Sequence, residues 1–179
     1  DIRYFPATIT GELRIYGQNR LTGDIFNMVA YPQSLAFSGS NTITGNIRNL
    51  QPETTQTEFS GQNILRGNIQ VLSSGVTTAQ FRGDSLTTGD VGLTPPNLIL
   101  LIMDGGPTSY TSKVWSNGLQ TIILGQGLSD SEIDDLIIDL SAVTWDGEKI
   151  LSITGSRTAA SDAAVTSLQA QGVTVTVAP

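Results

Sequence analysis

One segment of the chain gathers carboxylates that would be suited to acid–base chemistry. It runs from Asp130 to Asp139 and also contains Glu132, Asp134 and Asp135. Two carboxylates at a suitable separation hydrolyse a glycoside, and several together can bind Ca²⁺, although the segment lacks an Asp-x-Asp-x-Asp-Gly loop. Its apolar residues fall on one helical stripe, so most of the carboxylates should lie on the solvated side of a helix. We therefore expect a charged outer helix face and keep a carbohydrate-active enzyme as a remote alternative.

The composition removes most other catalytic chemistry. The chain has 179 residues with no His and no Cys, which excludes Ser-His-Asp and Cys-His nucleophiles, ordinary zinc sites and disulfides. No Gly-x-x-x-x-Gly-Lys-Ser/Thr loop is present to hold a nucleotide. The net charge of −7 argues against a nucleic-acid partner. The most apolar run, Leu98 to Met103, is far shorter than the ~20 residues of a membrane-spanning helix. We expect no enzyme activity, no catalytic residues, no metal, no cofactor and no membrane insertion.

Two groups of residues have side chains suited to contacting a ligand or partner. The first is an irregular insertion over 106–118, which contains Tyr110, Lys113 and Trp115. Aromatic and cationic groups of this kind contact sugars or proteins, but the insertion would equally fit a loop tucked over the core with Trp115 covering its edge. The second group comprises Arg14, Tyr16 and Arg82, at outward positions of predicted strands. For these outward positions, plain solvation is the alternative.

The elements that must position these residues follow from an internal repeat. Gly17, Gly39, Gly61 and Gly83 are 22 residues apart, and Asn19, Asn41 and Asn63 follow two residues later at the same spacing. Apolar columns share this period, one of them being Ile15, Phe37, Phe59, Phe81 and Met103. The pattern predicts stacked coils of about 22 residues that bury alternate side chains in a continuous aliphatic core. The glycines would form the corners, and inward asparagines would bind the backbone groups that a tight corner leaves without partners.

The repeat changes character toward the C-terminus. We predict a single solenoid domain over 1–179: regular coils over 9–105, the insertion over 106–118, helix-bearing repeats over 119–157 and a C-terminal cap over 158–179. Ser129 and Glu132 form a capping-box pattern at the start of the first helix. Ser161 and Asp162 should cap a second helix over 163–171. The fold class is thus a β-rich solenoid with short α-helices in the C-terminal repeats and a helix–strand cap.

Certain segments resemble known families. Leu119-x-x-Ile122-x-Leu124-x-x-x-Leu128 followed by a helix resembles a leucine-rich repeat. Earlier copies, such as Leu35-x-Phe37-x-Gly39-x-Asn41, resemble a variant without a helix on the convex side. The C-terminal order of helix, strand, helix and strand resembles the leucine-rich-like C-terminal segments of virion appendage proteins of tailed bacteriophages and of surface proteins of Bacteroidota. The resemblance implies a leucine-rich-repeat-like solenoid of about 22-residue coils.

The resemblance gives two functional hypotheses of different classes. The first is a structural and binding module of a phage tail fibre, baseplate or head fibre, whose partners are other virion proteins or a glycan or protein of the host surface. The second is an adhesion domain on a bacterial cell surface or secreted from it. The localisation is accordingly the virion or, alternatively, the bacterial surface. We further expect the first coil to be covered by a second copy of the chain or by an upstream domain, because residues 1–7 are a thin cover.

Overall fold

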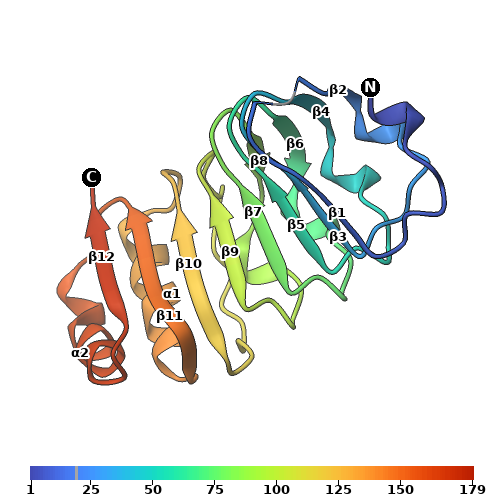
Figure 1. Cartoon of the computed structure of the whole chain (residues 1–179). Coiled ribbons are helices and arrows are strands. Elements are labelled where there is room, and N and C mark those ends of the chain that lie inside the picture. The colour runs from blue at the N-terminus through green and yellow to red at the C-terminus, as the bar shows by residue number, and fades with distance from the viewer. Residues whose placement is uncertain (19) are drawn as a thin grey trace.

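The computed structural model describes residues 1–18 and 20–179, and within them the strands form two parallel sheets. The inner sheet has eight strands in the order β1-β3-β5-β7-β9-β10-β11-β12, and the outer sheet has four in the order β2-β4-β6-β8. The inner strands are β1 (Glu12–Ile15), β3 (Ser34–Phe37), β5 (Gln56–Phe59), β7 (Thr78–Phe81), β9 (Leu100–Met103), β10 (Leu119–Leu124), β11 (Trp145–Thr154) and β12 (Thr174–Ala178). The outer strands are β2 (Thr22–Asp24), β4 (Thr42–Asn46), β6 (Ile64–Asn68) and β8 (Leu86–Thr88). The prediction of a β-rich fold with few short helices is confirmed (Figure 1).

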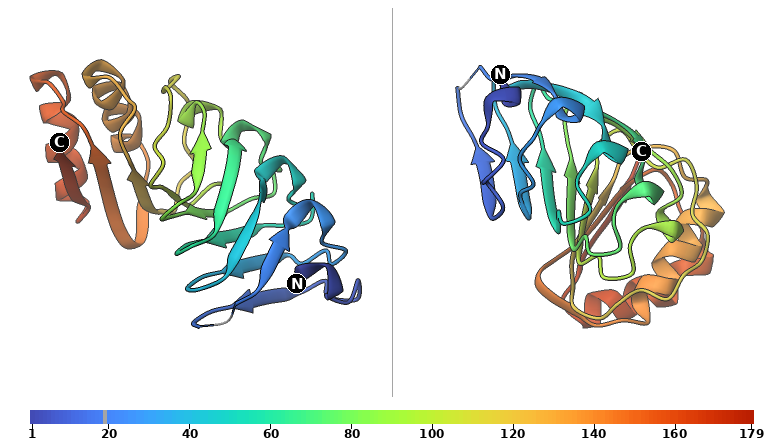
Figure 2. Two further views of the ribbon diagram at one scale, coloured as in Figure 1. Left: turned by 90° about the horizontal axis from the view of Figure 1, so that it is seen from above. Right: turned by 90° about the vertical axis from the view of Figure 1, so that its right-hand side faces the viewer.

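The inner sheet follows the 22-residue period of the sequence. Leu13 pairs with Leu35, Leu35 with Thr57, and Thr57 with Ala79, each 22 residues further along. The neighbouring column stacks the fully buried rings of Phe37, Phe59 and Phe81. Alternate residues of each strand therefore point into one shared core, and the residues between them form the exposed face of the inner sheet. Viewed from above, this sheet lies along the inner side of an arc (Figure 2, left).

The outer side differs from the sequence-based expectation. Each alternating run is divided at its glycine corner into an inner and an outer strand, and a single 3₁₀ turn follows each outer strand. These turns are η2 (Ile25–Asn27), η3 (Ile47–Asn49), η4 (Ile69–Val71) and η5 (Val91–Leu93). The expectation of no helix on the convex side is thus wrong at the level of single turns. The sequence carried a signal for them, because Asp24, Asn46, Asn68 and Asp90 recur with the period and each caps one turn through its side chain.

The corner asparagines that the structure describes are fully buried and use every polar group. Asn63 Oδ1 accepts from the Ile43 N–H at 2.9 Å, and its Nδ2 donates to the carbonyls of Phe37 and Ser60 at 3.0 and 2.7 Å. Asn41 makes the equivalent three bonds in the preceding coil, whereas Asn19 lies outside the described residues. Ser85 occupies the fourth place and accepts from the Leu65 N–H at 3.4 Å. These side chains satisfy backbone groups that the corners would otherwise bury without partners.

The glycine corners stack directly on one another. Gly17, Gly39, Gly61 and Gly83 all have positive φ, between 67° and 87°. A Cβ placed on Gly61 would lie 2.5 Å from the carbonyl oxygen of Gly39, and one on Gly39 would lie 2.1 Å from that of Gly17. Two constraints therefore coincide at this column, the left-handed backbone and the close approach of the preceding coil.

Two α-helices cover the C-terminal part of the arc, α1 (Asp130–Ser141) and α2 (Asp162–Ala170). The predicted capping box of α1 is present between Ser129 and Glu132, and the predicted apolar stripe of this helix is buried. The prediction for α2 was wrong in its cap: Ser161 ends a 3₁₀ turn, η6 (Ala159–Ser161), and makes no side-chain cap to α2. None of the helices in the described residues has the length and apolarity that crossing a membrane requires.

The N-terminal end is partly covered by the chain itself. The turn η1 (Ile2–Tyr4) packs against β2 and η2, and Ile2 is fully buried. Asp1 caps this turn, so Asp1 and Ile2 repeat the pattern of Asp24 and Ile25. Within the described residues, β1 has a partner strand only on the β3 side. The first residues thus complete the outer part of a coil but leave the edge of the inner sheet open.

Candidate functional site

The insertion over 106–118 turns its aromatic side chains inward. Tyr110 and Trp115 are 6% and 3% exposed. The Trp115 Nε1 donates to the Tyr110 hydroxyl at 3.1 Å, and this hydroxyl donates to Asp139 of α1 at 2.6 Å. Burial and the bond to Asp139 raise the pKa of Tyr110. The loop therefore lies over the edge of the core and is anchored to α1.

Lys113 is also occupied within the protein. Its ammonium lies 3.9 Å from the centroid of the Trp115 ring and donates to the Thr94 hydroxyl at 2.7 Å. Burial lowers the pKa of Lys113 to about 8. The expectation that Tyr110, Lys113 and Trp115 face a ligand is thereby corrected: their groups contact one another, and the alternative of a loop tucked over the core matches the geometry. The outward group of this loop is Val114, which is 95% exposed.

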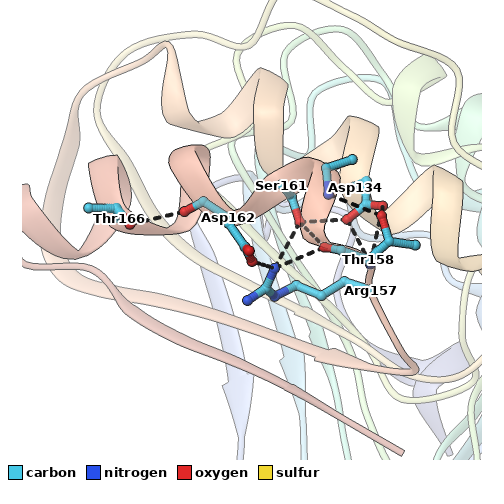
Figure 3. A network of polar contacts seen from close by, with 7 residues as sticks. Asp134, Arg157, Thr158, Ser161, Asp162 and Thr166 are labelled. Carbon is cyan, nitrogen blue, oxygen red and sulfur yellow. Dashed lines mark hydrogen bonds and ion pairs between the residues drawn. The ribbon is translucent and has the colours of Figure 1, made fainter.

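The carboxylates of α1 are bound more closely than the sequence predicted. Asp134 is only 4% exposed and accepts hydrogen bonds from the Thr158 N–H and from the hydroxyls of Thr158 and Ser161 (Figure 3). Burial alone would raise the pKa of Asp134, but these hydrogen bonds hold it below its ordinary value. Asp139 accepts from Tyr110 and Ser112. The expected solvated face was therefore wrong for these residues, because the next coil supplies donors to them.

The bonds to Asp134 hold the chain between β11 and α2. Arg157 Nη1 lies 2.5 Å from Asp162 and also donates to the Thr158 carbonyl at 3.0 Å (Figure 3). The hydroxyl of Ser161 is used by Asp134, which explains why it does not cap α2. This arrangement fixes a loop. Within residues 1–18 and 20–179, no group of three or more Asp or Glu side chains is placed to hold a metal ion.

Arg14 and Tyr16 belong to a polar network on the exposed face of the inner sheet. Arg14 donates to Ser34 Oγ at 3.2 Å and to Gln56 Oε1 at 3.0 Å, and it forms an ion pair with Glu12. The Tyr16 hydroxyl lies 3.5 Å from Glu58 Oε2, and burial together with this carboxylate raises its pKa. These bonds join β1 to β3 and β5, so the predicted site residues at this end hold neighbouring strands together.

Arg82 lies at a different place, on the rim of a hollow of about 430 Å³. The exposed face is aliphatic there, and its side chains come from three neighbouring strands. They are Leu100 and Ile102 of β9, Ile123 of β10 and Ile150 of β11. Gln80, Gln120 and Glu148 complete the rim. The structure thus separates Arg82 from Arg14 and Tyr16 and places it beside an apolar surface.

Sequence reasoning missed this hollow, although a signal was present. The run Leu98 to Met103 is apolar at every position, so it loses the in–out alternation of the earlier strands. Such a strand is expected where both faces are covered. The inward Leu101 and Met103 fill the core, which leaves Leu100 and Ile102 for the other face.

A bulge in β11 forms one wall of the hollow. Leu119 pairs with Trp145 but Thr121 pairs with Ile150, so the intervening residues of β11 loop out. Gly147 and Lys149 have positive φ of 61° and 54°, and Lys149 is the only non-glycine among the described residues to do so. The Lys149 ammonium donates to the carbonyl of Gln171 at 3.0 Å, which secures the bulge to the end of α2. Bulges and unusual backbone of this kind concentrate beside functional sites.

Comparison of the chain with protein-family models, with curated proteins and with solved structures found no match. The functional argument therefore depends on the geometry of the inner and outer faces.

Proposed function

We propose that the chain is a leucine-rich-repeat-like solenoid that serves as a non-enzymatic structural and binding module of a tailed-phage appendage, a tail fibre, baseplate or head fibre. In this proposal the inner face binds a protein, either a neighbour in the particle or a protein of the host surface. The support is the continuous inner sheet, which keeps the same two core columns from Leu13 to Val177. A surface of this length can contact an elongated partner.

The aliphatic hollow on the inner face is the observation that carries the proposal. Ile102 and Ile123 occupy outward positions that hold Arg14, Glu58 and Gln80 in the N-terminal strands. An apolar centre surrounded by amides and charges is typical of a protein interface. None of the described residues that line the hollow is aromatic, so it lacks the flat ring on which a sugar stacks.

The charges on the rim define what the partner must carry. The side chains of Arg82 and Glu148 have no hydrogen-bond or ion-pair partner among the described residues. They border the hollow from β7 and from the bulge of β11, three strand spacings or about 14 Å apart across the sheet. An extended segment of roughly four to six residues covers that distance. We infer a partner segment with aliphatic side chains at its centre, an acid facing Arg82 and a base facing Glu148.

The experiment is mass spectrometry of purified particles of a phage that encodes the chain, combined with partner capture on the isolated protein. The variant Ile123→Asp places a charge in the hollow, and Thr176→Asp is its control because both positions lie in the same outward row. We expect Ile123→Asp to reduce partner capture at least tenfold and Thr176→Asp to leave it unchanged. Particles that lack the chain would overturn the appendage proposal, and equal capture by both variants would overturn the assignment of the hollow.

A further inference from the structure

A second hollow lies on the opposite side of the molecule, outside the outer sheet. Its volume is about 650 Å³, within the roughly 300–1,000 Å³ of small-molecule sites. The strands β2, β4 and β6 and the turns η2 and η3 supply its lining. The groups that distinguish it are the ring of Phe26 and the guanidinium groups of Arg48 and Arg66.

The register of the outer sheet brings these groups together. Inner strands pair residues 22 apart, but outer strands pair residues 20 apart: Asp24 with Thr44, Thr44 with Ile64, and Asn46 with Arg66. Each outer strand is thus displaced by two residues from the position that the repeat would give it. The same step continued from Arg66 through Asn46 reaches Phe26, two coils away. Arg48, which follows two residues after Asn46, completes the group.

The side chains of this hollow are available for a ligand. Phe26 is 72% exposed, an unusual position for an aromatic ring. The guanidinium groups of Arg48 and Arg66 are exposed and have no hydrogen-bond or ion-pair partner among residues 1–18 and 20–179. By contrast, the one carboxylate in the lining, Asp24, is committed to capping η2 through the Phe26 N–H at 2.8 Å. The hollow is therefore locally cationic in a chain whose net charge is −7.

We propose that this outer hollow binds an acidic saccharide. The ring of one sugar stacks on Phe26, and its carboxylate or sulfate is held by Arg48 and Arg66, whose planar forks match such anions. The amides of Asn27 and Asn49 line the same hollow and are suited to sugar hydroxyls. A single aromatic ring and an acidic chain disfavour a nucleic acid, which needs a cationic track and repeated stacking platforms. The site goes beyond the proposed function, since it lies on the other face and takes another class of ligand.

Isothermal titration calorimetry with defined oligosaccharides tests the proposal. The probes are tetragalacturonate, a chondroitin sulfate tetrasaccharide, neutral maltotetraose and a short oligothymidylate. We expect one or both acidic saccharides to bind, maltotetraose and oligothymidylate to bind at least tenfold more weakly, and the affinity to fall as salt is raised. The two acidic probes distinguish a carboxylate from a sulfate as the recognised group.

Variants at exposed positions provide the controls. Phe26→Ala, Arg48→Ala and Arg66→Ala should each weaken saccharide binding at least fivefold without shifting the melting temperature. Arg82→Ala removes an exposed arginine of the inner face, and Leu93→Ala removes a 56%-exposed apolar side chain of η5; neither should change the affinity. The proposal is overturned if no acidic probe binds, if maltotetraose or oligothymidylate binds equally well, or if Arg48→Ala and Arg66→Ala bind like the wild type. Such a failure leaves the inner-face proposal standing, because that is measured by protein capture.

Discussion

Replacing Asn63 by Ala should remove a large part of the stability of the fold. The side chain is fully buried and makes three hydrogen bonds to backbone groups of two coils. Its loss leaves the Ile43 N–H and the carbonyls of Phe37 and Ser60 without partners, and each buried unsatisfied group costs about 1–3 kcal/mol. Allowing for partial entry of water, we expect a loss of about 4 kcal/mol from a total of roughly 5–15 kcal/mol.

A graded series makes this prediction sharp. Asn63→Ser should lose less, about 2 kcal/mol, because one of the three groups keeps a partner, and Ser85 already accepts a backbone N–H at the equivalent place one coil further on. Gln62→Ala, at the exposed neighbouring position, is the control and should change stability by less than about 0.5 kcal/mol.

Urea unfolding followed by circular dichroism and by tryptophan fluorescence measures the three variants. Trp115 and Trp145 both lie in the C-terminal half, so coincident transitions would show that the loss at Asn63 is transmitted through the whole stack. If Asn63→Ala were no more destabilising than Gln62→Ala, the reasoning about the ladder would be refuted. If the Ala variant does not fold, the Ser variant and Gln62→Ala still decide the order.

Three further predictions follow. Gly61→Ala should destabilise by about 2 kcal/mol or more, because its φ is +71° and the new Cβ would meet the Gly39 carbonyl at 2.5 Å; Gly11→Ala, with open space around it, should be nearly neutral in the same urea titration. Thr57→Val should stabilise by about 1 kcal/mol, because the Thr57 hydroxyl is buried without a partner among the described residues, and an unchanged or lower midpoint would contradict this. Between pH 7 and 9.5 the free energy of unfolding should rise by about 2 kcal/mol: the pKa of Lys113 is lowered to about 8 from 10.5, so the unfolded chain binds more protons in this range and the penalty of burying the ammonium is relieved as pH rises. Lys113→Met should flatten that profile, and an equal rise in both proteins would show that Lys113 is not its source.

The sequence predicted those features that repeat with a single period. Gly39, Gly61 and Asn63 could be assigned to corners because the same residue type recurs every 22 positions and because a corner restricts both backbone conformation and polar partners. The apolar stripe of α1 and its capping box were equally local, since both depend on spacings within a few residues.

The candidate sites were harder, because a side chain's role depends on what lies beside it. Trp115 and Lys113 have the same composition whether they face a ligand or each other, and only the fold shows that the ammonium lies 3.9 Å from the indole ring. Asp134 looked like a solvated carboxylate because its donors come from Thr158 and Ser161, which are 24 and 27 residues away.

The sequence by itself determined the coil, its corners and its core columns, because each of these is set by a periodic pattern of residue types. The tertiary structure alone decided the register between coils on the outer side. There the strands pair with a step of 20 residues instead of 22, and this difference carries Phe26 and Arg66 into one hollow. The physical reason is that strand register is fixed by backbone hydrogen bonds and by packing between neighbouring coils.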